Sequence, residues 1–243
     1  VNLQAQQFQP LAEDIREDYK KLPQLTALYR QSGEPFALNP IGTVQFSNFD
    51  TNEAGRPIGQ RLYAEGGVTY PMAWSYGFLR PTAKYRLLEY SLDRQVDALD
   101  EDPGAASALA SIDGGLVLER ETSLADRDVV QTLEPRLFYL FSQFDDQTAN
   151  PDFDSAELTF NYNQLFRDTR FSGRDRLDDA NQLALGLTTR FLDASTGEER
   201  FNASIGQIFY FTNRRVRLDA SDPELDRSSS EVAGELNFYP NER

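Results

Sequence analysis

The chain has 243 residues, a formal net charge of −15 at pH 7 and a pI of about 4.4. This length suits one sheet-based domain, or part of a larger one, and the acidic charge argues against a nucleic-acid partner. Histidine and cysteine are both absent from the sequence. The chain therefore cannot form a Ser–His–Asp or Cys–His catalytic site, the usual zinc site or a disulfide. We expect no catalytic residue, no metal site and no cofactor.

The sequence contains no stretch of 18 apolar residues, so no transmembrane helix is expected. Its first ten residues, "VNLQAQQFQP", lack the basic start and the apolar run of a secretory signal. We therefore expect a mature form or an internal piece of a longer protein.

Apolar and polar residues alternate along most of the chain, and this period of two predicts β-strands. The expected strands have about 10–15 residues, whereas a typical globular strand has about 5–6 and a membrane-crossing strand about 9–11. The ten strands are expected at 1–9, 24–32, 36–48, 59–72, 74–91, 113–123, 129–142, 181–192, 199–213 and 231–240.

Each expected strand has one apolar and one polar face. In 181–192, for example, Leu185 and Leu187 fall on one face and Thr188 on the other. Aromatic residues such as Tyr90 stand at the ends of the apolar faces, which is typical of an outer-membrane barrel. A soluble antiparallel sandwich with one wet face is the alternative. In a barrel the polar faces line the lumen, where we expect Arg80, Lys84, Arg86, Glu134 and Arg136.

The connections between the expected strands alternate in length. Those at 32–35, 71–74 and 124–128 are short, whereas 92–112 is long. Outer-membrane barrels have short periplasmic turns and longer external loops, so the alternation favours a barrel over a sandwich. The order is kept only if 143–180 is one long external loop, with a short hairpin or strand-like piece at 155–163. Loops longer than about 12–15 residues are usually functional.

The stretch 166–183, "FRDTRFSGRDRLDDANQL", is nearly balanced in charge. Its arginines and aspartates can pair with one another or with wall charges such as Glu134 and Arg136, since arginine makes planar bidentate pairs with carboxylates. Gly173 would permit a tight turn. The alternative is a solvated loop whose charges contribute little. The residues expected to pack in this loop are Arg170, Phe171, Arg174, Asp175, Arg176, Asp178 and Asp179.

Three blocks of the sequence resemble a known family. They are "TLEPRLFYLF", "LFRDTRFSGRDRLDDANQLALGLTTRF" and "ERFNASIGQIFYF", which lie between about residues 131 and 211. In order and spacing they resemble the barrel of the lipopolysaccharide-assembly family LptD, also called OstA or Imp. The pattern "RDR-x-x-DANQ" followed by "G-x-TTRF" is specific, whereas residues 1–130 match as barrel strands in general do.

This resemblance implies a very large barrel in the outer membrane of a Gram-negative bacterium. It implies transport of lipopolysaccharide into the outer leaflet, an LptE-type lipoprotein plug in the lumen and an LptA-type periplasmic bridge. The periplasmic domain and the paired cysteines of the family are not in this sequence. We therefore expect an all-β chain, an antiparallel transmembrane β-barrel segment of about ten strands from the middle of a larger barrel, in contact with outer-membrane lipids. On the resemblance, the loop 143–180 is expected to fold into the lumen and either contact the plug or narrow the lumen.

Two other readings remain open at this stage. One is a different outer-membrane barrel, such as a porin or a surface-exposed adhesin. The other is a soluble β-rich carbohydrate-active enzyme. Two local features are also noted: the aspartates of 145–154, which favour an acidic surface loop over a calcium site, and Trp74, expected to be an interfacial anchor.

Overall fold

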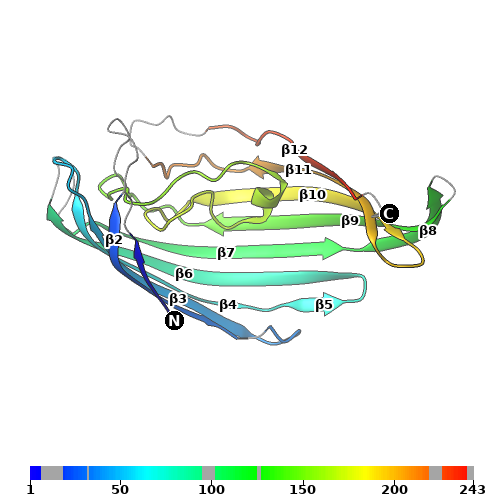
Figure 1. The fold of residues 1–243 in the computed structure, drawn as a ribbon, viewed down its shortest axis with the longest axis horizontal. Coiled ribbons are helices and arrows are strands. Elements are labelled where there is room, and N and C mark those ends of the chain that lie inside the picture. The colour runs from blue at the N-terminus through cyan, green and yellow to red at the C-terminus, as the bar shows by residue number, and fades with distance from the viewer. Residues whose placement is uncertain (7–18, 32, 95–101, 125–126, 219–225, 240–243) are drawn as a thin grey trace.

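The computed structural model describes residues 1–6, 19–31, 33–94, 102–124, 127–218 and 226–239. The strands found in these residues form one antiparallel sheet (Figure 1). In chain order the elements are β1 (Asn2–Gln6), β2 (Lys20–Arg30), β3 (Asn39–Asp50), β4 (Ile58–Thr69), β5 (Met72–Trp74), β6 (Gly77–Arg94), β7 (Gly104–Leu116), β8 (Leu118–Leu124), β9 (Arg127–Ser142), the 3₁₀ helix η1 (Tyr162–Phe166), β10 (Ala180–Asp193), β11 (Glu199–Tyr210) and β12 (Ala233–Phe238).

Neighbours in the sheet are neighbours in the chain. The order is β1-β2-β3-β4-β6-β7-β9-β10-β11-β12, with β5 paired to β6 and β8 paired to β9. The strands β4 and β5 thus form two pieces of one strand alongside β6, and β7 and β8 do the same alongside β9. The prediction of an all-β antiparallel sheet with about ten long strands is confirmed.

The largest error in the predicted strands concerns the segment after β6. The expected long connection at 92–112 is wrong, because β7 already begins at Gly104. The sequence of β7 begins "GAASALAS", so alanine and serine alternate there with too little contrast in polarity to show a period of two. Parts of the expected strands 1–9, 24–32 and 231–240 lie outside the described residues.

The two faces of the sheet differ as the alternation predicts. Large apolar side chains on one face, here called the outer face, stay exposed, including Tyr85, Leu137, Leu185, Ile205 and Phe238. The other face, called the inner face, carries most of the charged and hydroxyl side chains of the strands, and the segment 143–179 packs against it. In Figure 1 that segment, drawn in yellow-green between β9 and β10, lies over the strands.

Tyr90 is an exception to the predicted faces. It was expected among the aromatics that close the apolar faces, but its side chain is buried on the inner face, where its hydroxyl donates to Asp175 Oδ1 at 2.9 Å. Tyr90 is four residues from Arg86 in an unbroken register, so period two in fact places it on the polar face, and the expectation did not follow the alternation. What the alternation does not show is the segment 143–179 that buries it.

The expected alternation of short and long connections holds only in part, because 51–57 is no longer than 31–38, whereas 143–179 is much longer than 75–76 and 194–198. Because successive strands are antiparallel, 51–57 and 143–179 leave one end of the sheet, and 31–38, 75–76 and 194–198 leave the other. At the second end Trp74 is 42% exposed, and its ring lies 5.6 Å from that of Phe36. The role of Trp74 as an interfacial anchor stays a prediction. No helix among the described residues is long and apolar enough to cross a bilayer.

Both edge strands of the sheet have one unpaired side. In the described part of the chain, β1 pairs only with β2, and β12 pairs only with β11. An unpaired strand edge exposes backbone donors and acceptors that further strands can satisfy. The sheet is therefore suited to continue into a larger one on both sides.

Two adjacent residues of β11 test the expectation that the outer face would meet lipid. Ile205 lies on the outer face and Ser204 on the inner face. In the full-length protein, Ile205→Arg should cost about 2–4 kcal/mol of folding free energy in lipid vesicles, because a charge then faces hydrocarbon. Ser204→Arg should cost about 1 kcal/mol or less, the scale of a lost hydrogen bond to Thr188. Urea titration would measure both, and equal costs would contradict the assignment of the faces.

Candidate functional site

The segment 143–179 forms the candidate site together with the inner face. It carries little regular structure of its own. An antiparallel bridge joins Glu157 to Phe171, flanked by hydrogen bonds of 2.8 Å from Leu158 N to the Arg170 carbonyl and from Ser172 N to the Ala156 carbonyl. This bridge agrees with the strand-like piece expected at 155–163. The helix η1 follows it, and the side chain of Asn161 caps its first turn.

Glycines in the wall make room for η1. Gly186 of β10 pairs directly with Gly206 of β11 on the inner face. A Cβ atom on Gly186 would lie 2.6 Å from the Phe166 ring, and one on Gly206 would lie 2.5 Å from a methyl group of Leu165. The two glycines therefore leave a space on the inner face, here called the glycine seat, into which η1 packs with Leu165 fully buried.

Asp175 is the central residue of the packed segment. Its side chain has no exposed surface and accepts hydrogen bonds from two sheet residues, Arg61 Nη1 at 2.5 Å and Tyr90 OH at 2.9 Å. The other carboxylate oxygen accepts three bonds within the segment, from the backbone N–H groups of Phe153 and Asp154 at 3.0 and 2.8 Å and from the Ser155 hydroxyl at 3.1 Å. A buried carboxylate is tolerated when it is paired and hydrogen-bonded in this way.

Arg61 connects this cluster to a second carboxylate. Its Nη1 lies 2.6 Å from Asp154 Oδ1, and Lys21 Nζ of β2 lies 2.7 Å from Asp154 Oδ2. Burial alone would raise the pKa of Asp154, but the two cations outweigh burial and hold the pKa well below its ordinary value. Asp154 thus stays ionised and ties β2 and β4 to the segment.

Arg86 is held in a different way. It is almost fully buried, and its Nη2 donates to three neutral oxygens: Ser107 Oγ at 3.1 Å, Ser142 Oγ at 2.6 Å and the Asp178 carbonyl at 3.1 Å. Ser142 also donates to that carbonyl at 2.5 Å. These bonds fix the last residues of the segment where they re-enter β10.

Three residues of the stretch 166–183 bind the backbone of the connection that follows β11, and one of them, Arg170, donates to the Val216 carbonyl. Arg176 donates to the carbonyls of Arg217 and Leu218, both at 2.7 Å. Asp179 accepts the backbone N–H groups of Arg215 and Val216 at 2.9–3.1 Å. Segments that follow β9 and β11 are therefore locked to each other.

The remaining members of the stretch are also placed by contacts within the chain. Arg170 Nε lies 3.0 Å from Asp178 Oδ1, and its guanidinium covers the buried ring of Phe171 at 4.7 Å. Arg174 lies over the Tyr63 ring at 4.6 Å. Gly173 has a φ of +67° and lies so close to the Asp154 carbonyl that a Cβ atom would clash at 2.6 Å, which agrees with the predicted tight turn.

The five charged residues expected on the polar faces all belong to the inner face, but the segment uses only some of them. Lys84 lies 2.7 Å from Asp168, and Arg86 is bonded as described above. Of the two expected alternatives, pairing inside the stretch occurs between Arg170 and Asp178, whereas Glu134 and Arg136 form their ion pairs within the wall, with Arg190 at 3.0 Å and Asp113 at 2.9 Å. Arg136 still contacts the stretch, because its guanidinium lies 4.0 Å from the centre of the Phe166 ring.

Arg61 is the functional residue that sequence reasoning missed. The alternation places Arg61 on the polar face of β4, and the sequence shows a group of acidic residues in 145–154. Their partnership depends on how 143–179 folds back over the sheet, which no local pattern encodes. Asp145 and Asp146 bind other groups, the Ala106 N–H and Thr148, and the described residues contain no group of three or more acidic side chains placed to hold a metal ion.

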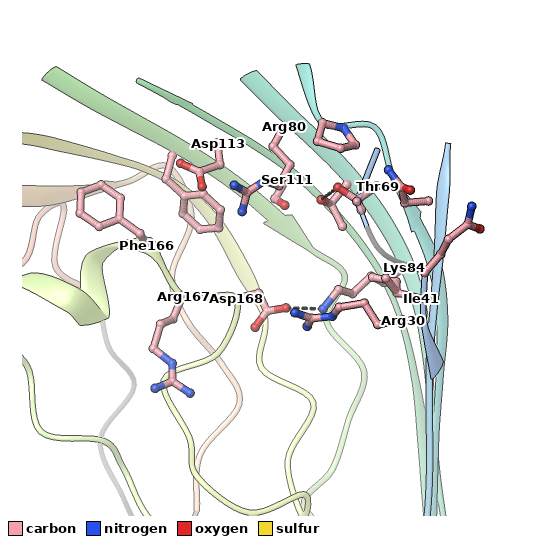
Figure 2. A pocket seen from close by; sticks show the side chains of 16 residues that line it. Arg30, Ile41, Thr69, Arg80, Lys84, Ser111, Asp113, Phe166, Arg167 and Asp168 are labelled. Carbon is pink, nitrogen blue, oxygen red and sulfur yellow. Dashed lines mark hydrogen bonds and ion pairs between the residues drawn. The ribbon is translucent and has the colours of Figure 1, made fainter. Parts of the chain in front are cut away.

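Beside the packed segment, the inner face has a cavity near the end of the sheet from which 31–38 and 75–76 leave. The cavity there has a volume of about 630 Å³ (Figure 2). Arg30 of β2, Arg80 and Lys84 of β6 and Arg167 of the segment bring four cationic side chains to its wall, while Asp113 and Asp168 are its acidic residues. Figure 2 shows the Lys84–Asp168 pair between β6 and the segment.

Comparison with known proteins identifies the family. Residues 1–243 match the family LptD, described as LPS transport system D. The chain belongs to the LptD family. The LPS-assembly protein LptD of Hahella chejuensis is 36% identical over 246 residues, covering 98% of this chain and 31% of the relative. The proteins of the same name from Nitrosomonas europaea and Neisseria gonorrhoeae are 37% and 38% identical, covering 96% and 95% of this chain and 32% and 29% of each relative.

The chain therefore spans about a third of the length of these LptD relatives. The resemblance seen in the sequence is confirmed at the level of the family, and the family is described as a transport system. The block "RDRLDDANQ" that pointed to LptD holds Asp175, Arg176 and Asp179, which lock the segment in place.

Substitution of Asp175 tests the lock. In the full-length LptD-family protein, Asp175→Asn should destabilise the packed segment by about 3 kcal/mol, because it removes the charge that faces buried Arg61 and places amide hydrogens against other donors. Hydrogen exchange at the amides of 153–155 would measure this change. Asp146→Asn is the matched control, since Asp146 is exposed and bonds only within its own turn. Equal exchange in both variants would contradict the role of Asp175.

Proposed function

We propose that this chain forms part of the wall of an outer-membrane barrel that carries lipopolysaccharide to the outer leaflet. The observation that supports it most is one sheet with an apolar outer face and a charged inner face covered by its own segment, in a chain of the LptD family. In this role the outer face contacts membrane lipids, and the two unpaired edges continue into further strands. The role needs no residue that makes or breaks bonds.

We further propose that the end bearing 143–179 faces the cell exterior and that this segment lies in the lumen. The connection 143–179, by far the longest between two strands that are described throughout, leaves that end, and in outer-membrane barrels the longer loops are the external ones. In a closed barrel the inner face becomes the lumen wall, so a segment packed on it narrows the passage. The cell outer membrane is the location that follows.

The proposed partner of the segment is an LptE-type lipoprotein plug. Among the residues first expected to touch it, Arg170 and Arg174 are partly exposed, whereas the others are buried within the chain: Phe171, Asp175, Arg176, Asp178 and Asp179. The surface left for a plug is therefore the exposed side of the segment, which includes Glu157 and Phe160. An LptA-type bridge is proposed as a partner of the whole protein.

A complementation experiment tests the transport role. A Gram-negative host whose own copy of the gene is repressed would express the full-length protein that contains this chain. We expect growth and surface lipopolysaccharide, measured by antibody labelling of intact cells, to return to normal. Asp175→Asn should lower the surface signal several-fold at equal protein level, and Asp146→Asn should not. Restored uptake of small solutes without surface lipopolysaccharide would favour a porin instead.

Photocrosslinking tests the partner. A photoreactive residue at Phe160, which is 39% exposed, should capture a small lipoprotein in living cells. The same residue at Leu137, on the outer face, should not capture it. Phe171 is unsuitable for the probe because only 3% of it is exposed. Capture at Leu137 but not at Phe160 would place the plug outside the lumen and overturn the arrangement.

A further inference from the structure

The outer face carries a groove that crosses the strands from β6 to β11. It has a volume of about 640 Å³, and almost all of its lining is apolar. Paired residues of neighbouring strands share a face, so the register places most of the lining on the outer face. Arg136 also borders the groove, but its guanidinium is paired with Asp113 on the inner face. The outer-face lining consists of Leu79, Gly114, Leu116, Pro135, Leu137, Leu185, Leu187 and Ile205.

Gly114 of β7 creates the depression. Its partners on the two neighbouring strands are Leu79 and Leu137, so a residue without a side chain interrupts a row of leucines. A Cβ atom on Gly114 would lie 3.0 Å from the tip of the Leu79 side chain and no closer than 3.6 Å to any other atom. Gly114 is not among the glycines with a positive φ. It therefore supplies space on the outer face, and not an unusual backbone conformation.

A cation stands on the same face, toward the end of the sheet from which 75–76 and 194–198 leave (Figure 1). Arg120 of β8 is exposed, and its Nε donates to Gln131 of β9 at 2.8 Å. Arg120 forms no ion pair with any residue that the structure describes. Phe191 pairs with Gln131 in the register, and its ring lies 5.8 Å from that of Phe201. Aromatic and basic side chains on a lipid-facing surface are typical of the level of the lipid headgroups.

The spacing between Arg120 and the groove matches the dimensions of a lipid. Pro135 lines the groove, and Gln131, the partner of Arg120, lies four residues away on the same strand. At about 3.3 Å per residue, Arg120 is about 13 Å from the groove along the strand. The headgroup region of one leaflet is about 5–7 Å thick and its hydrocarbon is about 15 Å thick. A phosphate at Arg120 therefore brings the upper half of its acyl chains to the level of the groove.

We propose that the groove binds one acyl chain of a phospholipid in the periplasmic leaflet, with the phosphate of that lipid held by Arg120. The inference rests on the proposed function, which places the outer face in lipid and this end of the sheet toward the periplasm. A peptide segment is a poor occupant, because its backbone polar groups would lie unsatisfied in hydrocarbon, whereas an acyl chain has none. The free guanidinium of Arg120 favours a lipid with a phosphate, which it can bind through two hydrogen bonds.

Lipid photolabelling of the purified full-length protein, with any co-purifying partner, tests this proposal. The protein is placed in vesicles of phosphatidylethanolamine and phosphatidylglycerol that contain a trace of phosphatidylglycerol with a diazirine midway along one acyl chain. After illumination, mass spectrometry of the peptides measures the labelling at each position. Labelling at Leu137 in the groove should exceed labelling at Val68 by five-fold or more, although the two side chains are 40% and 42% exposed on the same face.

One pair of variants tests the groove. Gly114→Leu should fill it, because only the tip of Leu79 has to move, and should lower labelling at Leu137 to the level of Val68. Ala110→Leu is the matched control, since it also places a leucine on the outer face of β7 but four residues away and outside the groove. It should change labelling at Leu137 by less than two-fold.

A second pair of variants tests the phosphate. Arg120→Gln should lower labelling at Leu137 five-fold or more, whereas Arg227→Gln, which removes an exposed arginine at the opposite end of the sheet, should not. A diacylglycerol with the same diazirine chain has no phosphate and should label Leu137 no more than Val68. Equal labelling by the two probes, or an unchanged result in Arg120→Gln, would overturn the proposal. Stronger labelling of Leu137 by a lipopolysaccharide with the same diazirine would replace the phospholipid as the occupant and also overturn it.

The pattern of labelling separates this inference from the proposed function. Equal labelling at Leu137 and Val68 in the wild type would show an outer face that meets lipid without a site, so the inference would fail and the proposed function would stand. Labelling of both residues no greater than that of Ser204 on the inner face would mean that the outer face does not meet lipid. In that case the proposed function would fail together with the inference.

Discussion

The buried pair of Asp175 and Arg61 is the contact on which the arrangement of the inner face depends. A carboxylate with no exposed surface is costly unless its lone pairs are used, and here five donors from the sheet and the segment use them. Because those donors come from β4, β6 and 153–155, the pair fixes the segment to the wall at one place. Leu177 and Phe153 then complete an apolar cluster with Tyr90 and Leu88 around it.

One face of the sheet suits this segment, and the other suits a lipid surface. The outer face is largely apolar, whereas the inner face changes in character along the strands. Under the segment it offers aromatic residues, the glycine seat of Gly186 and Gly206 and the buried Arg86. Beyond the segment it offers uncovered charge around Arg30 and Arg80. Strand β6 contributes to both parts of the inner face, with Tyr90 and Arg86 under the segment and Arg80 beyond it.

The strands and their faces could be predicted because alternation is a local property of the sequence. The placement of Lys84 and Arg86 on the polar face follows from it, and the turn at Gly173 follows from the backbone freedom of glycine. The partners could not be predicted in the same way. Arg61 and Asp175 are 114 residues apart in the chain, and Arg136 forms its ion pair with Asp113 on the neighbouring strand while its guanidinium lies over the Phe166 ring. Register and the path of a long connection decide such pairs, and β7 shows that even alternation fails where both faces hold small residues.

Arg176 and Asp179 grip the connection after β11 entirely through main-chain atoms, the carbonyls of Arg217 and Leu218 and the amides of Arg215 and Val216. These bonds do not depend on the side chains at 215–218, although Val216 is buried and the Arg215 guanidinium lies over the Phe144 ring. If this end of the sheet faces the surroundings of the cell, exposed positions of the connection can vary in sequence, as external loops exposed to antibodies or phages do, without loss of these main-chain bonds. Arg176 and Asp179 themselves cannot vary in the same way, because their side chains make the bonds.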